Sequence, residues 1–246
     1  MVSVCMATFN GQDFIRDQVL SVLEELGPGD ELIISDDSST DNTVALIQEL
    51  HDPRIKLFTG FNGRSPVANF ENALRHVSGQ YVFLCDQDDI WLPGKVTHCI
   101  EVLQTHDIVV TDCNVVNERL EVLHESFFKS MNSGPGFFKN FFKNTYLGCC
   151  MAFRSEIIPI ILPFPKNIPM HDIWIGFVGE LMLRTAFSEK SFLKYRRHKQ
   201  NVSSTTEKSS AKFFQQVGFR VGLISNIPSL IYRYYRKQGN LKEVNA

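Results

Sequence analysis

The stretch Tyr81-Val82-Phe83-Leu84-Cys85-Asp86-Gln87-Asp88-Asp89-Ile90-Trp91 decides how the rest of this chain of 246 residues is interpreted. It begins with an apolar run that is typical of a buried strand and continues into three carboxylates within four positions. Like charges so close together repel, and removing them from water raises the cost further. A divalent cation relieves both effects, since it prefers oxygen ligands and commonly accompanies a phosphorylated substrate. The stretch therefore predicts a site for a metal and a phosphate-bearing ligand at the end of a strand.

Segments of strand length alternate with helical patterns through the first half of the chain. We expect strands over residues 2–7, 31–35, 54–58, 81–84 and 108–111. This alternation indicates an α/β fold with a mostly parallel sheet and helices on both faces. Ligands bind such sheets beyond the carboxyl ends of the strands. Three polar clusters follow strands and are expected to meet there: Thr8-Phe9-Asn10, Ser35-Asp36-Asp37 and Asp86-Gln87-Asp88.

The second half of the chain is less regular. We expect strands over residues 147–153 and 192–197, and a helix over residues 170–184. Three Phe-Phe-Lys triplets lie between residues 127 and 143 and form either an acceptor loop or part of the core. A helical stretch over residues 212–237 mixes apolar and basic residues, with a break expected at Pro228.

Composition excludes several classes of protein. The net charge of −2 gives no reason to expect nucleic acid as a partner. Six cysteines without CxxC spacing are typical of buried, reduced thiols, so we expect a cytoplasmic protein. The first residues already have the pattern of a core strand, and no apolar run is long enough to span a membrane. We therefore expect neither a signal peptide nor a membrane anchor.

The polar segment over residues 35–43 has two interpretations. Ser, Thr and Asp side chains commonly accept hydrogen bonds from the free amides of a first helical turn, which accounts for one or two of these residues. It does not account for the pair Asp36-Asp37 at the end of a strand. A carboxylate in that position can accept hydrogen bonds from a nucleobase or a ribose.

The order of these clusters resembles the family 2 glycosyltransferases. The matching segments are residues 7–11, 35–41 and 86–91, followed by Tyr146 to Met151, Pro163-Phe164-Pro165, Met170-His171-Asp172-Ile173-Trp174, and Tyr195-Arg196-Arg197-His198 with Asn201. The resemblance covers residues 1–205 and is strongest to a bacterial branch with many rhamnosyltransferases. It implies a GT-A fold and an inverting, metal-dependent transfer from a nucleotide-sugar. It also divides this region into a nucleotide-sugar-binding half (1–112) and an acceptor and catalytic-base half (113–205).

Roles for the donor site follow from the resemblance, position by position. Asp37 matches the contact to the base of the donor, and Ala7 and Phe9 match the lining of the nucleotide pocket. Asp88 matches the main ligand of a Mg²⁺ or Mn²⁺ ion, and Asp86 matches a contact to the donor sugar or ribose. The donor implied is a dTDP- or UDP-sugar.

The resemblance also implies that Asp172 is the catalytic base. Inversion requires attack in line with the leaving nucleoside diphosphate, so a carboxylate on the opposite face must take the proton of the acceptor hydroxyl. A residue far along the chain from Asp88, at the start of a helix, meets this requirement. The alternative role for Asp172 is the N-cap of that helix, and both roles are compatible.

Other residues carry a functional and a structural interpretation side by side. His198 could contact the metal or a phosphate, and Arg197 could bind the diphosphate, or both could belong to a solvated basic face. Arg64 and Asn69 could face the donor, or serve at the surface and in capping. Trp91 could stack on a sugar ring or fill core space.

The last segment, residues 206–246, differs from the rest in charge. Between residues 194 and 237 there are ten Lys or Arg and one acidic residue, Glu207. A basic amphipathic helix can lie on an anionic membrane, which would suit an enzyme with a lipid-linked acceptor at the inner face of the cell membrane. A helix packed on the domain, or a dimer contact, is the alternative.

We therefore expect an inverting glycosyltransferase that acts on a glycan or lipid-linked glycan in bacterial surface polysaccharide synthesis. A nucleotidylyltransferase would need a Gly-rich, Arg-containing loop after the first strand, which is absent from the sequence. A phosphatase with an aspartyl nucleophile would carry its acids after the first strand rather than the fourth. A non-catalytic, membrane-associated subunit with the same fold remains the alternative, although the presence of both Asp88 and Asp172 argues against it.

Overall fold

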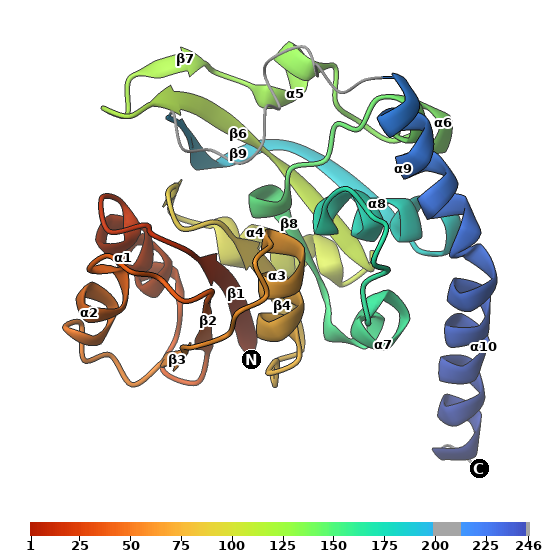
Figure 1. The fold of residues 1–246 in the computed structure, drawn as a ribbon, viewed down its shortest axis with the longest axis horizontal. Coiled ribbons are helices and arrows are strands. Elements are labelled where there is room, and N and C mark those ends of the chain that lie inside the picture. The colour runs from red at the N-terminus through yellow and green to blue at the C-terminus, as the bar shows by residue number, and fades with distance from the viewer. Residues whose placement is uncertain (199–212, 245–246) are drawn as a thin grey trace.

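The computed structural model describes residues 1–198 and 213–244 (Figure 1). Asn201 and the polar segment 203–210 lie outside these residues. The described residues form a nine-stranded sheet in the order β3-β2-β1-β4-β8-β6-β9-β5, with β7 paired to β6. The strands are β1 (Val2–Thr8), β2 (Glu31–Asp36), β3 (Ile55–Phe58), β4 (Tyr81–Cys85), β5 (Ile90–Trp91), β6 (Ile108–Asn117), β7 (Val122–His124), β8 (Met151–Arg154) and β9 (Thr185–Arg197).

The first four strands are parallel neighbours. Met6 of β1 pairs with Ile34 of β2 on one side and with Cys85 of β4 on the other. These three residues are fully buried, because helices cover this part of the sheet, and this explains why its strands are apolar on both faces. The expected α/β fold with a mostly parallel sheet is confirmed.

The second half of the sheet is mixed. β8 runs antiparallel to both β4 and β6, whereas β6 and β9 are parallel. The strand expected over residues 147–153 was placed too early, since Gly148–Cys150 form a 3-10 turn and pairing begins only at Met151. β9 begins seven residues before the expected start, since its first half carries polar residues that hide the strand pattern.

Helices surround the sheet. The main ones are α1 (Ile15–Glu25), α2 (Thr43–Gln48), α3 (Pro66–Leu74), α4 (Lys95–Leu103), α7 (Ile158–Ile161) and α8 (His171–Met182). Two short helices of the Phe-rich region, α5 (Phe127–Met131) and α6 (Phe137–Phe142), were not expected. α3 begins with Ser65, whose side chain accepts a hydrogen bond from the Ala68 amide, and packs on β1 and β2. α8 contacts α3, α6 and α7.

The C-terminal tail is helical, as expected. It consists of α9 (Phe213–Ser225) and α10 (Ile227–Val244), and the break falls at Asn226, so that Pro228 stands in the first turn of α10. Leu223 and Leu230 are buried, and α10 contacts α7 before it extends past the body of the molecule (Figure 1). Among the helices that the structure describes, none combines the length and hydropathy needed to cross a membrane.

Candidate active site

The three polar clusters meet at the carboxyl edge of β1, β2 and β4. Thr8 donates a hydrogen bond from Oγ1 to Asp36 Oδ2 (2.9 Å). The amide of Phe9 donates to Gln87 Oε1 (2.8 Å), and Gln87 Nε2 donates back to the Phe9 carbonyl (3.1 Å). A Cβ at Gly11 would lie 2.5 Å from Gln87 Oε1, so the glycine makes room for this contact. Gln87 belongs to a cluster that was expected at this edge, but no role of its own was predicted for it, since nothing in its type or spacing marks one.

Both carboxylates of the second cluster are buried and hydrogen-bonded. Asp36 is buried and accepts hydrogen bonds from Thr8 and from the amide of Ser39 (2.8 Å). Asp37 Oδ1 accepts from the amides of Gly63 (2.7 Å) and Arg64 (3.2 Å), which fastens the loop after β3. Local hydrogen bonding therefore accounts for Asp36, and it also engages one oxygen of Asp37 at this carboxyl edge of the sheet.

Four other residues that are expected to bind the donor lie near the same carboxyl edge of the sheet. Ala7 is half-buried at the end of β1, and Phe9 is 55% exposed. Arg64 is exposed, has a φ of +52° and donates from Nε to Asn62 Oδ1 (3.1 Å). Asn69 is buried and donates from Nδ2 to the Thr8 carbonyl (3.0 Å), so part of its hydrogen bonding is structural.

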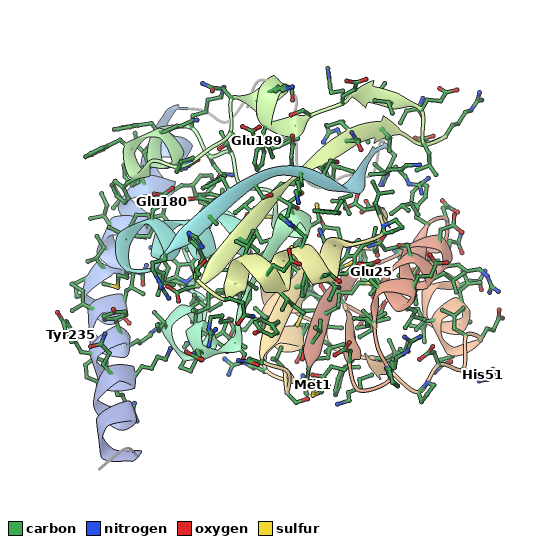
Figure 2. The ribbon with its side chains drawn as sticks, turned by 180° about the vertical axis from the view of Figure 1, so that it is seen from behind. Met1, Glu25, His51, Glu180, Glu189 and Tyr235 are labelled. Atoms are coloured by element: carbon green, nitrogen blue, oxygen red, sulfur yellow. The ribbon has the colours of Figure 1, made fainter. Side chains whose placement is uncertain are left out.

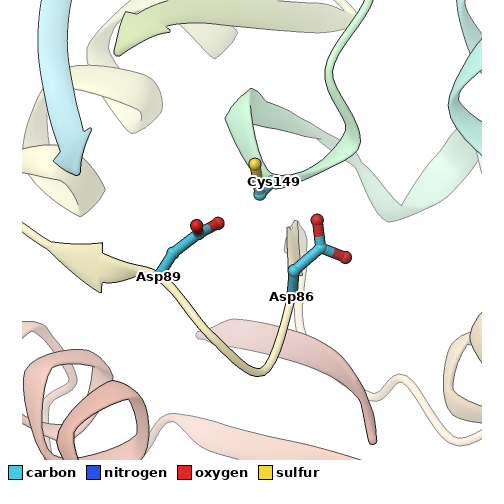
Figure 3. A group of neighbouring side chains, drawn as sticks. All are labelled: Asp86, Asp89 and Cys149. Atoms are coloured by element: carbon cyan, nitrogen blue, oxygen red, sulfur yellow. The ribbon is translucent and has the colours of Figure 1, made fainter. Parts of the chain in front are cut away.

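The acid loop, residues 86–89, connects β4 to β5. Burial and the charges of Asp88 and Asp172 raise the pKa of Asp86 to about 8. Asp89 is fully buried, and burial together with the charges of Asp88 and Asp86 raises its pKa well above the usual range. In Figure 3 the carboxyl groups of Asp86 and Asp89 lie on either side of Cys149 and below its thiol, and one ligand atom of each of the three residues lies within 4.8 Å of the others. The loop therefore concentrates negative charge where little water reaches it.

Arg196, near the end of β9, anchors the acid loop. Its amide donates to Asp89 Oδ1 (2.9 Å), and its guanidinium donates from Nε to the Asp88 carbonyl (2.8 Å). The Nη1 group donates to the Glu118 carbonyl (2.8 Å), and the guanidinium lies 4.7 Å from the ring centroid of Phe14. The sequence alone assigned Arg196 no role of its own, because its burial becomes visible only once β9 is placed.

His198 follows β9 and reaches the acid loop. Its Nε2 lies 2.7 Å from Asp88 Oδ2, and its ring lies 4.6 Å from that of Phe14. Arg197 lies over the ring of Tyr195, at 5.9 Å. Trp91 is only 3% exposed and packs near Phe83, an arrangement that fits the core-filling alternative.

Asp172 lies in the first turn of α8. The N-cap of the helix is Met170, and Asp172 Oδ1 accepts from the amide of Ile173 (2.7 Å). Burial raises the pKa of Asp172 to about 6, although the amides of Ile173 and Gly148 favour the charged form. A buried carboxylate with this pKa has the properties of a general base near neutral pH.

His171 precedes Asp172 in α8, and its buried ring packs against Phe70 and Gly148. Its ring stacks on Phe70 with 4.0 Å between centroids, and burial lowers the pKa of His171 to about 3, so the imidazole is neutral. A Cβ at Gly148 would lie 2.8 Å from His171 Nε2. The close approach of Gly148 therefore holds both His171 and Asp172 in place.

The arrangement brings carboxylates from two distant parts of the chain to one place. The acid loop follows β4, whereas Asp172 lies in the first turn of α8. The two are close enough that the charge of Asp172 contributes to the raised pKa of Asp86. Asp88 and His198 offer an oxygen and a nitrogen ligand on the side of the loop that Arg196 supports. Such a site can bind a cation with an anionic ligand and place a base opposite them.

Comparison with known sequences identifies relatives of one kind. Residues 3–159 match the Glycosyl transferase family 2 profile. The chain is 24% identical over 222 residues to the UDP-Glc:alpha-D-GlcNAc-diphosphoundecaprenol beta-1,3-glucosyltransferase WfgD of Escherichia coli, covering 89% of this chain and 85% of that protein. It is 26% identical over 251 residues to the dTDP-rhamnosyl transferase RfbG of Shigella flexneri, covering 95% of this chain and 81% of that protein.

Solved structures share the fold at lower identity. The S. aureus TarS 1-349 structure in complex with UDP-GlcNAc superposes with a TM-score of 0.68 at 18% identity, over 92% of this chain and 66% of that chain. The mannosyltransferase PcManGT from Pyrobaculum calidifontis, in complex with GDP-Man and Mn²⁺, gives 0.60 at 18% identity, over 81% of this chain and 58% of that chain. The likeness establishes the GT-A fold. The match over most of the sheet, together with these relatives, shows that the chain is a glycosyltransferase and belongs to glycosyl transferase family 2.

Proposed function

We propose that this glycosyltransferase moves a sugar from a UDP- or dTDP-sugar to a hydroxyl of a glycan acceptor, with inversion and with the help of a divalent cation. The observation that carries the proposal is the approach of Asp172 to the acid loop. The charge of Asp172 is among the causes that raise the pKa of Asp86, although the two residues lie on different elements. A base and a diphosphate-binding loop on opposite sides of one site are what inversion requires.

Asp172 is the base in this proposal. With a pKa of about 6, its carboxylate is mostly deprotonated at neutral pH and still basic enough to take the proton of an acceptor hydroxyl. The amides of Gly148 and Ile173 orient the carboxylate, and the neutral ring of His171 packs against Gly148. The hydroxyl oxygen then attacks the anomeric carbon from the side opposite to the nucleoside diphosphate.

The acid loop fits a Mg²⁺ or Mn²⁺ ion. Burial, and after it the charges of neighbouring carboxylates, raises the pKa of Asp86 and of Asp89, and a hard cation with oxygen ligands offsets both effects. We assign the ion to Asp88 and His198, and Asp86 to the donor sugar or ribose. We do not assign it to Cys149, a soft ligand whose thiol pKa is raised well above its usual range by burial. A bound ion would offset the charge that develops on the leaving diphosphate.

The donor and acceptor classes come from the relatives and from the rim of the site. The names of WfgD and RfbG specify a UDP-sugar and a dTDP-sugar, and WfgD takes a diphosphoundecaprenol-linked acceptor. We infer that Asp37 contacts the donor base with Ala7 and Phe9, and that Arg64, Asn69 and Arg197 lie within reach of the donor. Rhamnose is one candidate sugar. A lipid-linked glycan of surface polysaccharide synthesis is the proposed acceptor, reached from the cytoplasm at the inner face of the membrane.

Release of nucleoside diphosphate from a panel of nucleotide-sugars, with Mn²⁺, Mg²⁺ or EDTA, tests the proposal. We expect cation-dependent release from one donor, and loss of that release in Asp88→Asn. If no donor is cleaved but UDP or dTDP binds with a cation, the protein is a binding subunit with the same fold. If neither nucleotide binds, the donor assignment is wrong.

A further inference from the structure

The short helix α6 exposes two phenylalanines. Phe138 is 74% exposed and Phe142 is 64% exposed. Their neighbours Phe137 and Phe141 instead face inward and lie 5.7 and 6.3 Å from the ring of Phe177 in α8. Packing of the inward pair thus fixes the helix and presents the outward pair to the surroundings.

The helix α9 continues this apolar surface. Arg220 donates from Nη2 to the Phe142 carbonyl (2.7 Å) and from Nε to the Phe141 carbonyl (3.3 Å), and so joins α9 to the end of α6. Val221 is 58% exposed and Ile224 is 51% exposed; three positions apart, they share one side of the helix. We call Phe138, Phe142, Val221 and Ile224 the α6–α9 face. The two helices lie side by side at the upper right of Figure 1.

The two segments that carry this face have charged residues of one sign. Residues 127–155 and 217–239 contain no Asp or Glu. Lys143 is exposed directly beside Phe142, and Arg220 lies 5.7 Å from the Phe142 ring. Farther along the tail, Tyr235 is exposed and projects from α10 away from the body (Figure 2). Exposed aromatic side chains with flanking cations, in segments that contain no acidic residue, complement the interface of a membrane that carries anionic lipids.

We propose that the α6–α9 face docks on an anionic bilayer, with Phe138 and Phe142 entering the headgroup boundary and Lys143 meeting lipid phosphates. The inference rests on the proposed lipid-linked acceptor and names the surface that delivers the enzyme to it.

The face is also fastened to the helix that carries the base. Glu180 of α8 accepts from the amide of Gly136, the N-cap of α6 (3.0 Å), and from Nδ2 of Asn140 within that helix (3.2 Å). Glu180 lies eight residues after Asp172, about 12 Å along the helix axis. If α6 docks on the membrane, Asp172 is therefore held at a fixed distance from the membrane surface. An acceptor sugar attached to a lipid diphosphate also lies at a fixed distance from that surface, so the two can meet.

Sedimentation of the full-length protein with vesicles of phosphatidylglycerol and phosphatidylcholine, and with phosphatidylcholine alone, tests the proposal. We expect binding to the anionic vesicles that weakens with salt. The double variant Phe138→Ser/Phe142→Ser should bind them about tenfold less or worse, since it removes most of the inserted apolar area. Lys143→Glu should lower binding at least about fivefold. The matched control Val122→Ser/Leu123→Ser changes similarly exposed apolar residues on β7, at the other end of the molecule in Figure 1, and should bind as wild type does.

Release of nucleoside diphosphate in the absence of vesicles separates this inference from the proposed function. The Phe138→Ser/Phe142→Ser variant should keep wild-type release, which shows that it is folded and that the site is intact. Equal vesicle binding by this variant and wild type would overturn the inference even if the transferase activity is present. The inference would also be overturned if the wild type does not bind vesicles but forms a dimer in sedimentation velocity, and the double variant does not form this dimer.

Discussion

The substitution Asp172→Asn should abolish transfer and stabilise the fold at the same time. Asn keeps the shape of the side chain and one acceptor oxygen for the amide of Ile173, but it cannot take a proton. Loss of an oriented general base typically lowers the rate by about 10²- to 10⁴-fold. Donor binding should persist, because the nucleotide side of the site is unchanged.

The stability gain can be worked from the pKa of this group. Burial raises the pKa of Asp172 from 3.8 to about 6, and that difference corresponds to about 3 kcal/mol. Below about pH 4 Asp172 is protonated in both the folded and the unfolded chain, so its burial then costs no charge. As pH rises from about 4 through about 6, the unfolded chain loses this proton more readily than the folded chain, and the stability of the fold falls. The wild type therefore carries this penalty at pH 8, and Asn removes up to that amount.

Two measurements check this prediction together. Urea unfolding at pH 5 and pH 8 should show a gain for Asp172→Asn that is larger at pH 8, and the rate of the wild type should rise with pH through about 6. Asp107→Asn is the control, because hydrogen bonds from Arg184 outweigh burial and lower the pKa of Asp107, so its loss should destabilise the fold without changing the rate. A fully active Asp172→Asn would refute the assignment of the base, and equal stability at both pH values would refute the electrostatic argument.

Three further substitutions test the supports of the site. Asp88→Asn should weaken cation-dependent nucleotide binding at least about tenfold in calorimetry, since one charged ligand is lost. Gly148→Ala should cost about 1–3 kcal/mol in unfolding experiments and also slow transfer, because the new Cβ would meet His171 Nε2 at 2.8 Å; unchanged stability would show that the imidazole moves freely. Arg196→Lys should lose the guanidinium contacts to the Asp88 and Glu118 carbonyls, and should therefore lower the affinity for the cation more than the stability of the fold. A larger loss of stability than of cation affinity would show that the role of Arg196 is structural alone.

The parallel half of the fold could be predicted from sequence because its strands are buried on both faces. An apolar run such as residues 81–84 has one stable place, the centre of a covered sheet, and polar residues after it must lie at the carboxyl edge. The meeting of Thr8, Asp36 and Gln87 follows from that rule alone. The order of the strands does not, because it depends on which apolar surfaces fit together.

The other half could be predicted only in part, because tertiary contacts override its local pattern. The first half of β9 is half-exposed and polar, yet it pairs with β6 along its length. Gly148–Cys150 read as a continuation of a strand, yet they turn so that the Gly148 amide can reach Asp172. The importance of Arg196 could not be predicted for the same reason, since its partners lie more than 75 residues earlier in the chain.

The position of β9 also determines when the active site is completed during synthesis. β5 pairs with β9 and with no other described strand, and the acid loop receives the Arg196 amide and His198 from the same segment. A growing chain that ends after β8 therefore holds its acid loop in water, beside an edge strand that has no partner. Pairing of β9 with β6 and β5 places Arg196 and His198 on the loop. Among the described residues β9 is the last strand in the chain, so the site can be completed only after synthesis has passed residue 198.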